Sequence, residues 1–580
     1  MEEQSFPTPR RRIPSKKEVE CALGAFSPLE RLVFIVAMAA ALVTVLSILY
    51  KINDHFLVSV PGDGGTLNEG VVGTPRFVNP VLATTEADRD LSALVYRGLM
   101  KKDAEGNVVP DIAESYEVSD DGLIYTFVMK EATFQDGTNI TSDDVLFTVK
   151  SVQDPTLKSA LNVTWQGVIV KAVDEKTVSF TLKQPYASFL ELTTLGIMPK
   201  HIWSKISYED WTYSEFNTKS AIGAGLYRIK EISENANGVP QYYELEAYRP
   251  KNGPSPRIDT IRIHFYGSET DLIAAYRAGN IDAMGGIDPV SAEALAKTGA
   301  KVLTSPLPRV FGIFFNQSQT KIFTDVNVRK AVALAINRDS IVLSVLGGYG
   351  QPAIGPIPAA SKLASLPEKQ NTGADIEAAK KLLEKAGWKM GNDGIYQKQL
   401  SKKETVRLSF EIATNDIPEL TQAVNLMTAD LKEAGIEAIP KVYETGSLNQ
   451  DIIRPRKFQT LFFGEVISTA SHVYAFWHSS QRNDPGLNIS GYANSKTDTL
   501  LERGLATLDP KKELEIYDAF QKEIAADVPA VFIYSPSYIY IIRDDMTGIT
   551  IGSVTKPENR FAGIESWYMS TDRVWKIFAR

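Results

Sequence analysis

Glu465 is the residue of this sequence whose setting most needs a chemical explanation. It lies in the stretch TLFFGEVISTASHVYAFW, residues 460–477, whose apolar beginning predicts a buried strand interrupted by Gly464. A buried carboxylate is costly unless it is paired or hydrogen-bonded, and a glycine within a strand often marks a close approach by another group, sometimes a ligand. Three interpretations stay open: Glu465 binds a cationic group of a ligand, forms an ion pair inside the protein, or lies exposed at the end of a strand. The basic neighbours available for an ion pair are Arg454, Arg456 and Arg482.

The motifs of common enzymes and metal sites are absent from the sequence. It contains no Gly-x-Ser-x-Gly elbow, no phosphate-binding loop and no dinucleotide fingerprint. Cys21 is the only cysteine, and none of the 5 histidines lies in a His-Glu-x-x-His pattern. Zinc and iron–sulfur sites need several such ligands. We therefore expect no catalytic residue, no metal site and no cofactor, and we set aside a ligand-processing hydrolase.

Length and charge narrow the class of protein. A chain of 580 residues corresponds to about four domains at roughly 150 residues each. The formal net charge of −8 argues against a nucleic-acid partner, because such proteins carry clustered positive charge.

The uncharged stretch Leu32–Tyr50 predicts a transmembrane anchor. At about 1.5 Å per residue, a helix of this length just spans a hydrocarbon core of about 30 Å. Basic residues gather before this stretch, which places residues 1–31 in the cytoplasm as a basic tail and the remainder outside. A cleaved signal peptide is the alternative, but its apolar region is usually only about 7–15 residues long. The absence of cysteine after residue 50 suits an oxidising compartment.

Strand-like and helix-like segments alternate from residue 66 onward, which predicts an α/β protein. Helices are expected at 141–153, 268–279, 324–348 (divided near Asn337), 375–388 and 418–435. The last of these lies between two β-rich segments, an order that favours a parallel strand–helix–strand unit.

Several blocks, in order along the chain, resemble the bacterial extracellular solute-binding proteins of family 5, the peptide- and nickel-binding components of ABC importers. The blocks include PRFVNPVL, LVYRGLMKKDAEGNVVPDIAESYEVSDDGLIYTF, AIGAGLYRI, YRAGNIDAM, FFNQSQTKIFTDVNVRKAVALAINRDSIV and NISGYANSKTDTLLERG. In the third block, Ala224 and Leu226 replace the threonine and proline of the family's usual turn.

The resemblance implies a two-lobed, venus-flytrap fold of the periplasmic-binding-protein type II class with an extra inserted domain. In this chain the fold is preceded by the one transmembrane helix that the apolar stretch predicts. Domain I is expected at 61–103, 221–307 and 530–580, domain II at 104–220, and domain III at 308–529. The anchor at 32–50 would be joined to them by a short tether at 51–65. The chain crossings near 220, 307 and 529 are the expected hinges for closure around a ligand.

The resemblance also implies a function. The protein would be a monomer that captures a peptide or other small polar solute and passes it to ABC permease and ATPase subunits. Combined with the predicted anchor, this places it in the cell membrane, with a cytoplasmic N-terminus and a binding domain outside, in the periplasm or on the cell surface. Two alternatives stay open: the solute is not a peptide, or the protein is a ligand-sensing receptor that signals through a membrane partner.

The same resemblance indicates which residues line the cleft, and where this chain departs from the family. In the oligopeptide branch, an aspartate four residues after the glycine binds the α-ammonium group of the peptide; Ser468 stands at that position here, so the usual anchor is missing. The expected cleft residues are Phe77, Asn79, Phe314, Asn316, Gly464, Glu465, Val466, Ser468, Tyr474 and Trp477.

Overall fold

The computed structural model describes residues 15–17, 19, 24–186, 188–250, 253–364, 372–401, 404–546 and 548–578. Most of the predicted tail at 1–31, Cys21 included, lies outside these ranges. The chain forms two compact units: the first combines residues 1–62 with 570–580, and the second comprises 63–569.

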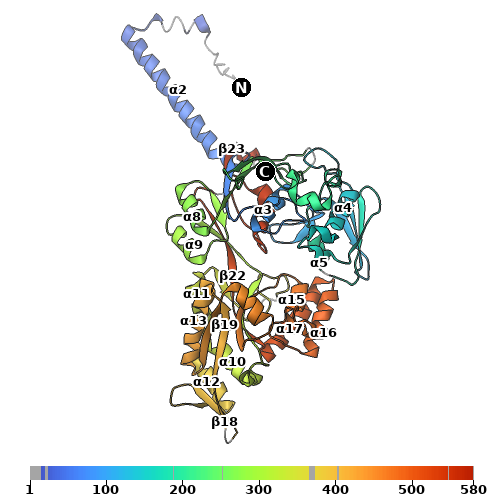
Figure 1. Ribbon diagram of the computed structural model, residues 1–580. Coiled ribbons are helices and arrows are strands. Elements are labelled where there is room, and N and C mark those ends of the chain that lie inside the picture. Colours follow the sequence, from blue (N-terminus) through green and yellow to red (C-terminus); the bar gives the residue numbers. More distant parts are fainter. Residues whose placement is uncertain are drawn as a thin grey trace, which may run out of the picture. The chain divides into compact units, whose positions relative to one another are not determined.

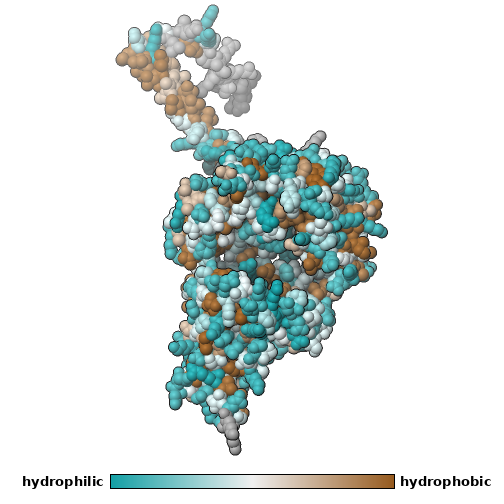
Figure 2. All heavy atoms as spheres, viewed as in Figure 1, coloured by the Kyte–Doolittle hydropathy of each residue, from teal (hydrophilic) through white to brown (hydrophobic). Residues whose placement is uncertain are grey.

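The first unit contains a long apolar helix and a two-stranded sheet. Helix α2 (Pro28–Phe56) begins at Ser27, whose N–H donates to the Glu30 carboxylate at 2.8 Å, and it includes the predicted anchor. Its hydrophobic side chains are exposed along its length (Figure 2). The chain passes directly into β1 (Leu57–Gly62), which pairs antiparallel with β23 (Ser570–Trp575). Most residues of the predicted tether at 51–65 thus continue the helix and then form a strand, while their role as a tether stays a prediction.

The second unit is built on a mixed sheet of 12 strands. Its main path runs through β20 (Glu437–Tyr443), β19 (Ser409–Asn415), β21 (Thr460–Val466), β14 (Arg309–Phe315), β22 (Ala530–Ile542), β12 (Ala283–Gly285), β2 (Thr66–Val72), β11 (Thr260–Tyr266), β10 (Pro240–Ala247) and β9 (Tyr227–Glu234). The 13-residue strand β22 joins the two halves: its beginning pairs with β14 and its end with β12 (Figure 1). Strands β13 (Lys301–Pro306) and β15 (Gly350–Pro352) also pair with β22.

Smaller sheets complete the unit. The sheet of β5 (Ala113–Val118), β6 (Ile124–Met129), β8 (Thr177–Thr181) and β7 (Ile169–Ala172) packs against α4 (Ser142–Gln153). Helix α4 begins as predicted, with the Asp144 carboxylate accepting from the Thr141 N–H at 2.9 Å. The remaining strands are β3 (Met100–Lys102) with β4 (Val108–Pro110), and β16 (Lys389–Met390), β17 (Tyr396–Ser401) and β18 (Glu404–Arg407).

Helices cover both faces of the half of the sheet that contains β21. One face packs on a core with α10 (Val326–Ala335), α11 (Arg338–Leu346), α12 (Ile376–Lys385) and α13 (Pro418–Glu433). The other face packs on a core with α15 (Ala470–Trp477), α16 (Ser495–Ala506) and α17 (Pro510–Asp527). Outside this half, α3 (Glu86–Val95) lies on the largest core, and α8 (Glu269–Ala278) and α9 (Pro289–Ala296) cover β12.

The predicted strand–helix–strand unit is confirmed. Strands β19 and β20 are parallel and α13 connects them. Gly435 follows α13 with φ +74°, a left-handed conformation that side chains other than glycine rarely adopt. The division near Asn337 is also confirmed, because this residue separates α10 from α11 and caps the latter. The α/β class is thus established, whereas the three-domain boundaries stay a prediction.

Candidate functional site

Strand β21 directs Glu465 into the protein. The strand lies between β19 and β14, and Glu465 is opposite Val310 of β14. Side chains alternate along a strand, so Glu465 shares a face with Leu461 and Phe463, both of which pack in the core with α15–α17. Only 1% of Glu465 is exposed.

The Glu465 carboxyl has no polar partner in the part of the chain that the structure describes. Among the described residues, no hydrogen bond or ion pair reaches either of its oxygens, and the indole N–H of Trp477 is likewise unpartnered. Burial raises the pKa of Glu465 well above its ordinary value; the Trp477 indole lies close enough to oppose this rise but does not form a hydrogen bond of normal geometry. Burial thus favours the protonated, neutral form of the Glu465 carboxyl over the carboxylate.

Two of the three interpretations of Glu465 are therefore wrong. The residue is not exposed, because its side chain is buried in the interior of the second unit. It is also not paired with a neighbouring arginine: the Arg456 guanidinium donates to the carbonyls of Ile453 and Gly486 at 3.0 and 2.8 Å, and Arg482 Nε donates to the Ser479 carbonyl at 3.0 Å. Arg454, too, forms no ion pair with Glu465 in the described chain. Binding of a ligand cation stays a prediction.

Gly464 is explained by packing inside the protein. A Cβ at this position would lie 2.7 Å from the ring of Phe311 on β14. That separation is far below van der Waals contact, so the glycine makes room for the phenylalanine ring. The close approach inferred from the sequence exists, but an aromatic side chain provides it.

A small cavity adjoins Ser468, immediately after β21. Its volume is about 60 Å³, and it is lined by Lys102, Glu105, Gly106, Glu191, Pro308, Ala360, Ser361, Lys362, Ser468, Ser553 and Thr555. Of the ten residues predicted to line a cleft, Ser468 is the one that borders this particular cavity, and the cleft itself stays a prediction. Its hydroxyl lies 3.1 Å from His472 Nδ1. Ligand pockets usually measure about 300–1,000 Å³, so a peptide enters only if the walls separate.

The cavity is lined by two lysines and two carboxylates, Glu105 and Glu191, and the two lysines differ in their partners. Lys102 Nζ lies 3.6 Å from Glu191 and donates to the Thr555 hydroxyl at 3.1 Å. Lys362 Nζ donates to the neutral amide oxygen of Asn107 at 3.0 Å. Burial, and after it the neighbouring Lys102 ammonium, lower the pKa of Lys362. Lys102 therefore has a carboxylate partner, whereas the hydrogen-bond partner of Lys362 is a neutral amide.

The other predicted site residues lie in different parts of the second unit. Phe314 is buried 6.2 Å from Trp477, measured between ring centroids, and the Trp477 indole in turn lies close to Glu465. Asn316 forms a turn, because its side chain donates to the Arg456 carbonyl and accepts from Ser318. Val466, at the end of β21, is 37% exposed.

The early Asn-Pro segment packs elsewhere. Asn79 is fully buried; its oxygen accepts from the Val81 N–H at 2.8 Å, while its Nδ2 has no partner among the described residues. Phe77 is partly buried on the core that contains α3 and lies beneath the Arg76 guanidinium. The structure does not bring these two residues into the cluster around Glu465.

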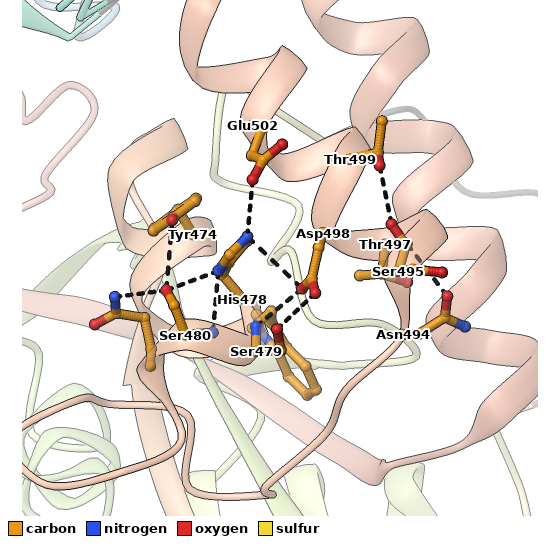
Figure 3. A network of polar contacts seen from close by, with 12 residues as sticks. Tyr474, His478, Ser479, Ser480, Asn494, Ser495, Thr497, Asp498, Thr499 and Glu502 are labelled. Atoms are coloured by element: carbon orange, nitrogen blue, oxygen red, sulfur yellow. Dashed lines mark hydrogen bonds and ion pairs between the residues drawn. The ribbon is translucent and has the colours of Figure 1, made fainter.

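His478, at the end of α15, forms the centre of a network of polar side chains (Figure 3). Tyr474 stacks on its ring at 4.2 Å, and its Nε2 lies 3.5 Å from Glu502 and 3.8 Å from Asp498. The Ser480 hydroxyl lies 2.8 Å from Nδ1, so that a serine, a histidine and an acid are in contact, as in a hydrolase triad. However, Nδ1 also accepts the Ser480 backbone N–H at 3.1 Å and thereby caps the next short helix. Its lone pair is engaged there, which makes this network structural.

The cavity residues that sequence reasoning missed are those contributed by distant segments. Lys102, Glu191, Lys362 and Thr555 show no common motif or spacing, and only the folded chain brings them together. The departure at Ser468 was the one signal in the sequence that pointed to this place.

Comparison with known proteins identifies relatives along most of the chain. The family model described as bacterial extracellular solute-binding proteins, family 5 Middle, matches residues 107–485. The oligopeptide-binding protein AppA of Bacillus subtilis is 29% identical over 530 residues, which cover 88% of this chain and 92% of that protein. The dipeptide-binding protein of Escherichia coli is 25% identical over 522 residues, covering 85% and 93%.

Solved structures match over a similar extent. That of Bacillus subtilis AppA in complex with a nonapeptide superimposes with a TM-score of 0.63 at 28% identity, covering 88% of this chain and all of the other. That of NikZ from Campylobacter jejuni in complex with Ni(L-His) gives a TM-score of 0.66 at 23% identity, with the same coverage. At 23% identity, the similarity to NikZ shows a shared fold only.

Proposed function

The chain belongs to the bacterial extracellular solute-binding proteins of family 5, and from this premise we propose that it is the membrane-anchored binding component of an ABC importer. It captures a peptide-like solute between two lobes on the extracytoplasmic side and delivers it to permease and ATPase subunits. The relatives named for oligopeptide and dipeptide binding support a peptide as the ligand.

The anchor in this proposal is helix α2, which crosses the membrane once with the N-terminus in the cytoplasm. Its apolar side chains are unburied in the first unit of the chain, so a hydrocarbon environment would cover them. The basic residues that precede the helix support the orientation, because positively charged segments stay on the cytoplasmic side.

The observation that carries the proposal is the cavity beside Ser468. In the proposed division into domains, its walls come from domains I and II through Lys102, Glu191 and Thr555, and from domain III through Lys362 and Ser468. The bond between Lys362 and Asn107 crosses the same boundary. The small volume is what a closed and unliganded arrangement would have. Opening about the crossings near 220, 307 and 529 provides room for a ligand, and the ligand's differential affinity then biases closure.

Glu465 and Lys362 supply complementary groups for a peptide. Glu465 carries a buried carboxyl that has no partner among the residues described, and a ligand cation would complete it after transfer of its proton. Lys362 carries an ammonium group with a neutral partner, which a ligand carboxylate would complete. A peptide has both charges, one at each end.

Calorimetry of the full chain in lipid nanodiscs, titrated with pools of dipeptides to octapeptides, tests this function. We expect saturable binding of at least one pool, and native mass spectrometry of the purified protein identifies any ligand that copurifies. Absence of heat with every pool, combined with a copurified solute that is not a peptide, would replace the peptide by that solute. Turnover of a bound peptide would contradict the non-enzymatic role.

A further inference from the structure

The C-terminal strand returns to the extracytoplasmic end of helix α2. Strand β1 follows the helix without a linker, and its partner β23 runs in the opposite direction, from Ser570 opposite Gly62 to Trp575 opposite Leu57. The chain therefore approaches the end of α2 as it nears its own C-terminus (Figure 1).

Side-chain contacts fix the last residues of β23 against the final turns of α2. The Trp575 ring stacks on Phe56, with centroids 5.9 Å apart and planes 19° from parallel. Its indole N–H donates to Asn53 at 2.8 Å, and Arg573 pairs with Asp54 at 2.5 Å. Trp575 thus lies at the level of residues 53–56 along the helix axis.

This level corresponds to the headgroup layer of a membrane. The apolar stretch of α2 ends at Tyr50, so residues 53–56 lie about 4.5–9 Å farther along the axis, at about 1.5 Å per residue. A bilayer of about 40–45 Å around a core of about 30 Å has headgroup layers of roughly 5–7.5 Å each, so Asn53 and Asp54 lie within the layer and Phe56 at its outer edge. The Trp575 indole therefore falls where tryptophan is enriched in membrane proteins.

The exposed side chains at this level are those that suit an interface. Trp575 is 42% exposed and Phe56 48%, and Ile577, which follows in the short helix Lys576–Phe578, is 78% exposed. Lys576 supplies a basic group beside them; a lysine of this kind places its stem along apolar surface and its ammonium among lipid phosphates.

We propose that the C-terminal segment Trp575–Phe578 lies in the lipid headgroup layer and forms a second contact with the membrane beside α2. This inference rests on the proposed anchoring by α2 and adds a partner surface, the lipid interface of the leaflet from which α2 emerges. Both ends of the folded chain then meet the membrane at one place.

Nitroxide labelling of the full chain tests the proposal. Cys21 is the only native cysteine, so single cysteines can be introduced in a Cys21→Ser background at Ile577, at Val43 within α2, and at the exposed Thr571 of β23. In nanodiscs of phosphatidylcholine and phosphatidylglycerol, collisions with oxygen report lipid exposure, and collisions with a water-soluble nickel chelate report water exposure. All three substituted side chains are exposed within their unit, so labelling leaves its packing intact.

We expect the nickel chelate to collide several-fold less with a label at 577 than with one at 571, while oxygen collisions at 577 lie between those at 43 and 571. If the label at 43 reports lipid but 577 resembles 571, the second contact is overturned and the anchoring stands. A water-exposed label at 43 would instead overturn the anchoring itself. Protection of 577 from both reagents, as contact with another protein gives, would also overturn the lipid contact.

Discussion

Arg560 binds Asp90 through two parallel hydrogen bonds, Nη1 to Oδ1 at 2.8 Å and Nη2 to Oδ2 at 2.5 Å, at a place where both side chains are at most 1% exposed. Arg560 Nε also donates to Glu69 at 2.9 Å, and the Tyr540 hydroxyl donates to the other Glu69 oxygen at 2.6 Å. One cation thus joins α3, β2 and the segment around 560, which are far apart in the sequence. Burial raises the pKa of both carboxyls, and the Arg560 charge opposes that rise.

Substitution of Arg560 should destabilise the fold strongly. Arg560→Met leaves two buried carboxyl groups without their cation, which costs about 3–5 kcal/mol in the free energy of unfolding. Urea denaturation followed by circular dichroism measures the loss. Arg228→Met is the matched control, because Arg228 pairs with Glu246 on the surface at 2.6 Å and such pairs contribute at most about 1 kcal/mol. Equal losses in the two variants would contradict the structural role of Arg560.

Glu86 should make stability depend on pH. Burial, together with the nearby Asp90 charge, raises its pKa to about 7. Since the folded protein holds this proton more tightly than the unfolded chain, the contribution of Glu86 to stability is complete below about pH 4.5 and is lost as pH rises through 7. Relative to Glu86→Gln, the wild type should therefore lose about 2 kcal/mol of its free energy of unfolding between pH 5 and pH 8. The partial exposure of the Glu86 side chain makes this loss smaller than full burial would.

Denaturation of both proteins across that pH range measures the difference. The same substitution at Glu234, an exposed residue at the end of β9, controls for loss of a surface charge. A wild type that gains stability relative to Glu86→Gln as pH rises would refute the stated environment of this residue.

The local elements were predictable, whereas the site was not. Capping at Thr141, the break at Asn337 and the glycine after α13 depend on a few neighbouring residues, and all three are found in the structure. The cavity depends on contacts such as that between Asn107 and Lys362, which no periodicity encodes. Strand β1 was not predicted for the same reason, since residues 57–62 show no strand signal of their own until β23 pairs with them.

Glu465→Gln should separate ligand binding from stability. The glutamine has nearly the shape of the neutral acid, and the carboxyl has no ion pair to lose within the described residues, so the free energy of unfolding at pH 7 should change by less than about 1 kcal/mol. Affinity for the peptide should fall by about 1.5–3 kcal/mol, because a neutral amide replaces the carboxylate that meets the ligand cation. Calorimetry and denaturation are measured on the same preparations. Unchanged affinity would remove Glu465 from the binding site.

Lys362→Met should weaken binding of ligands that carry a carboxylate. Lys362 lines the cavity beside Ser468, and its ammonium bonds to the neutral oxygen of Asn107, while Lys102 is already paired with Glu191. A ligand anion at this point forms a charge-assisted hydrogen bond, and its loss should reduce affinity by about 1.5–3 kcal/mol. Added salt should weaken wild-type binding more than binding by the variant, because screening acts on the missing interaction. Lys432→Met, at an exposed position near the end of α13, should leave both the affinity and its salt dependence unaltered.

Blocking the C-terminal carboxylate of the peptide as an amide distinguishes the contact from a general charge effect: it should weaken binding to the wild type and make little difference to Lys362→Met. Equal weakening in both proteins would place the carboxylate elsewhere.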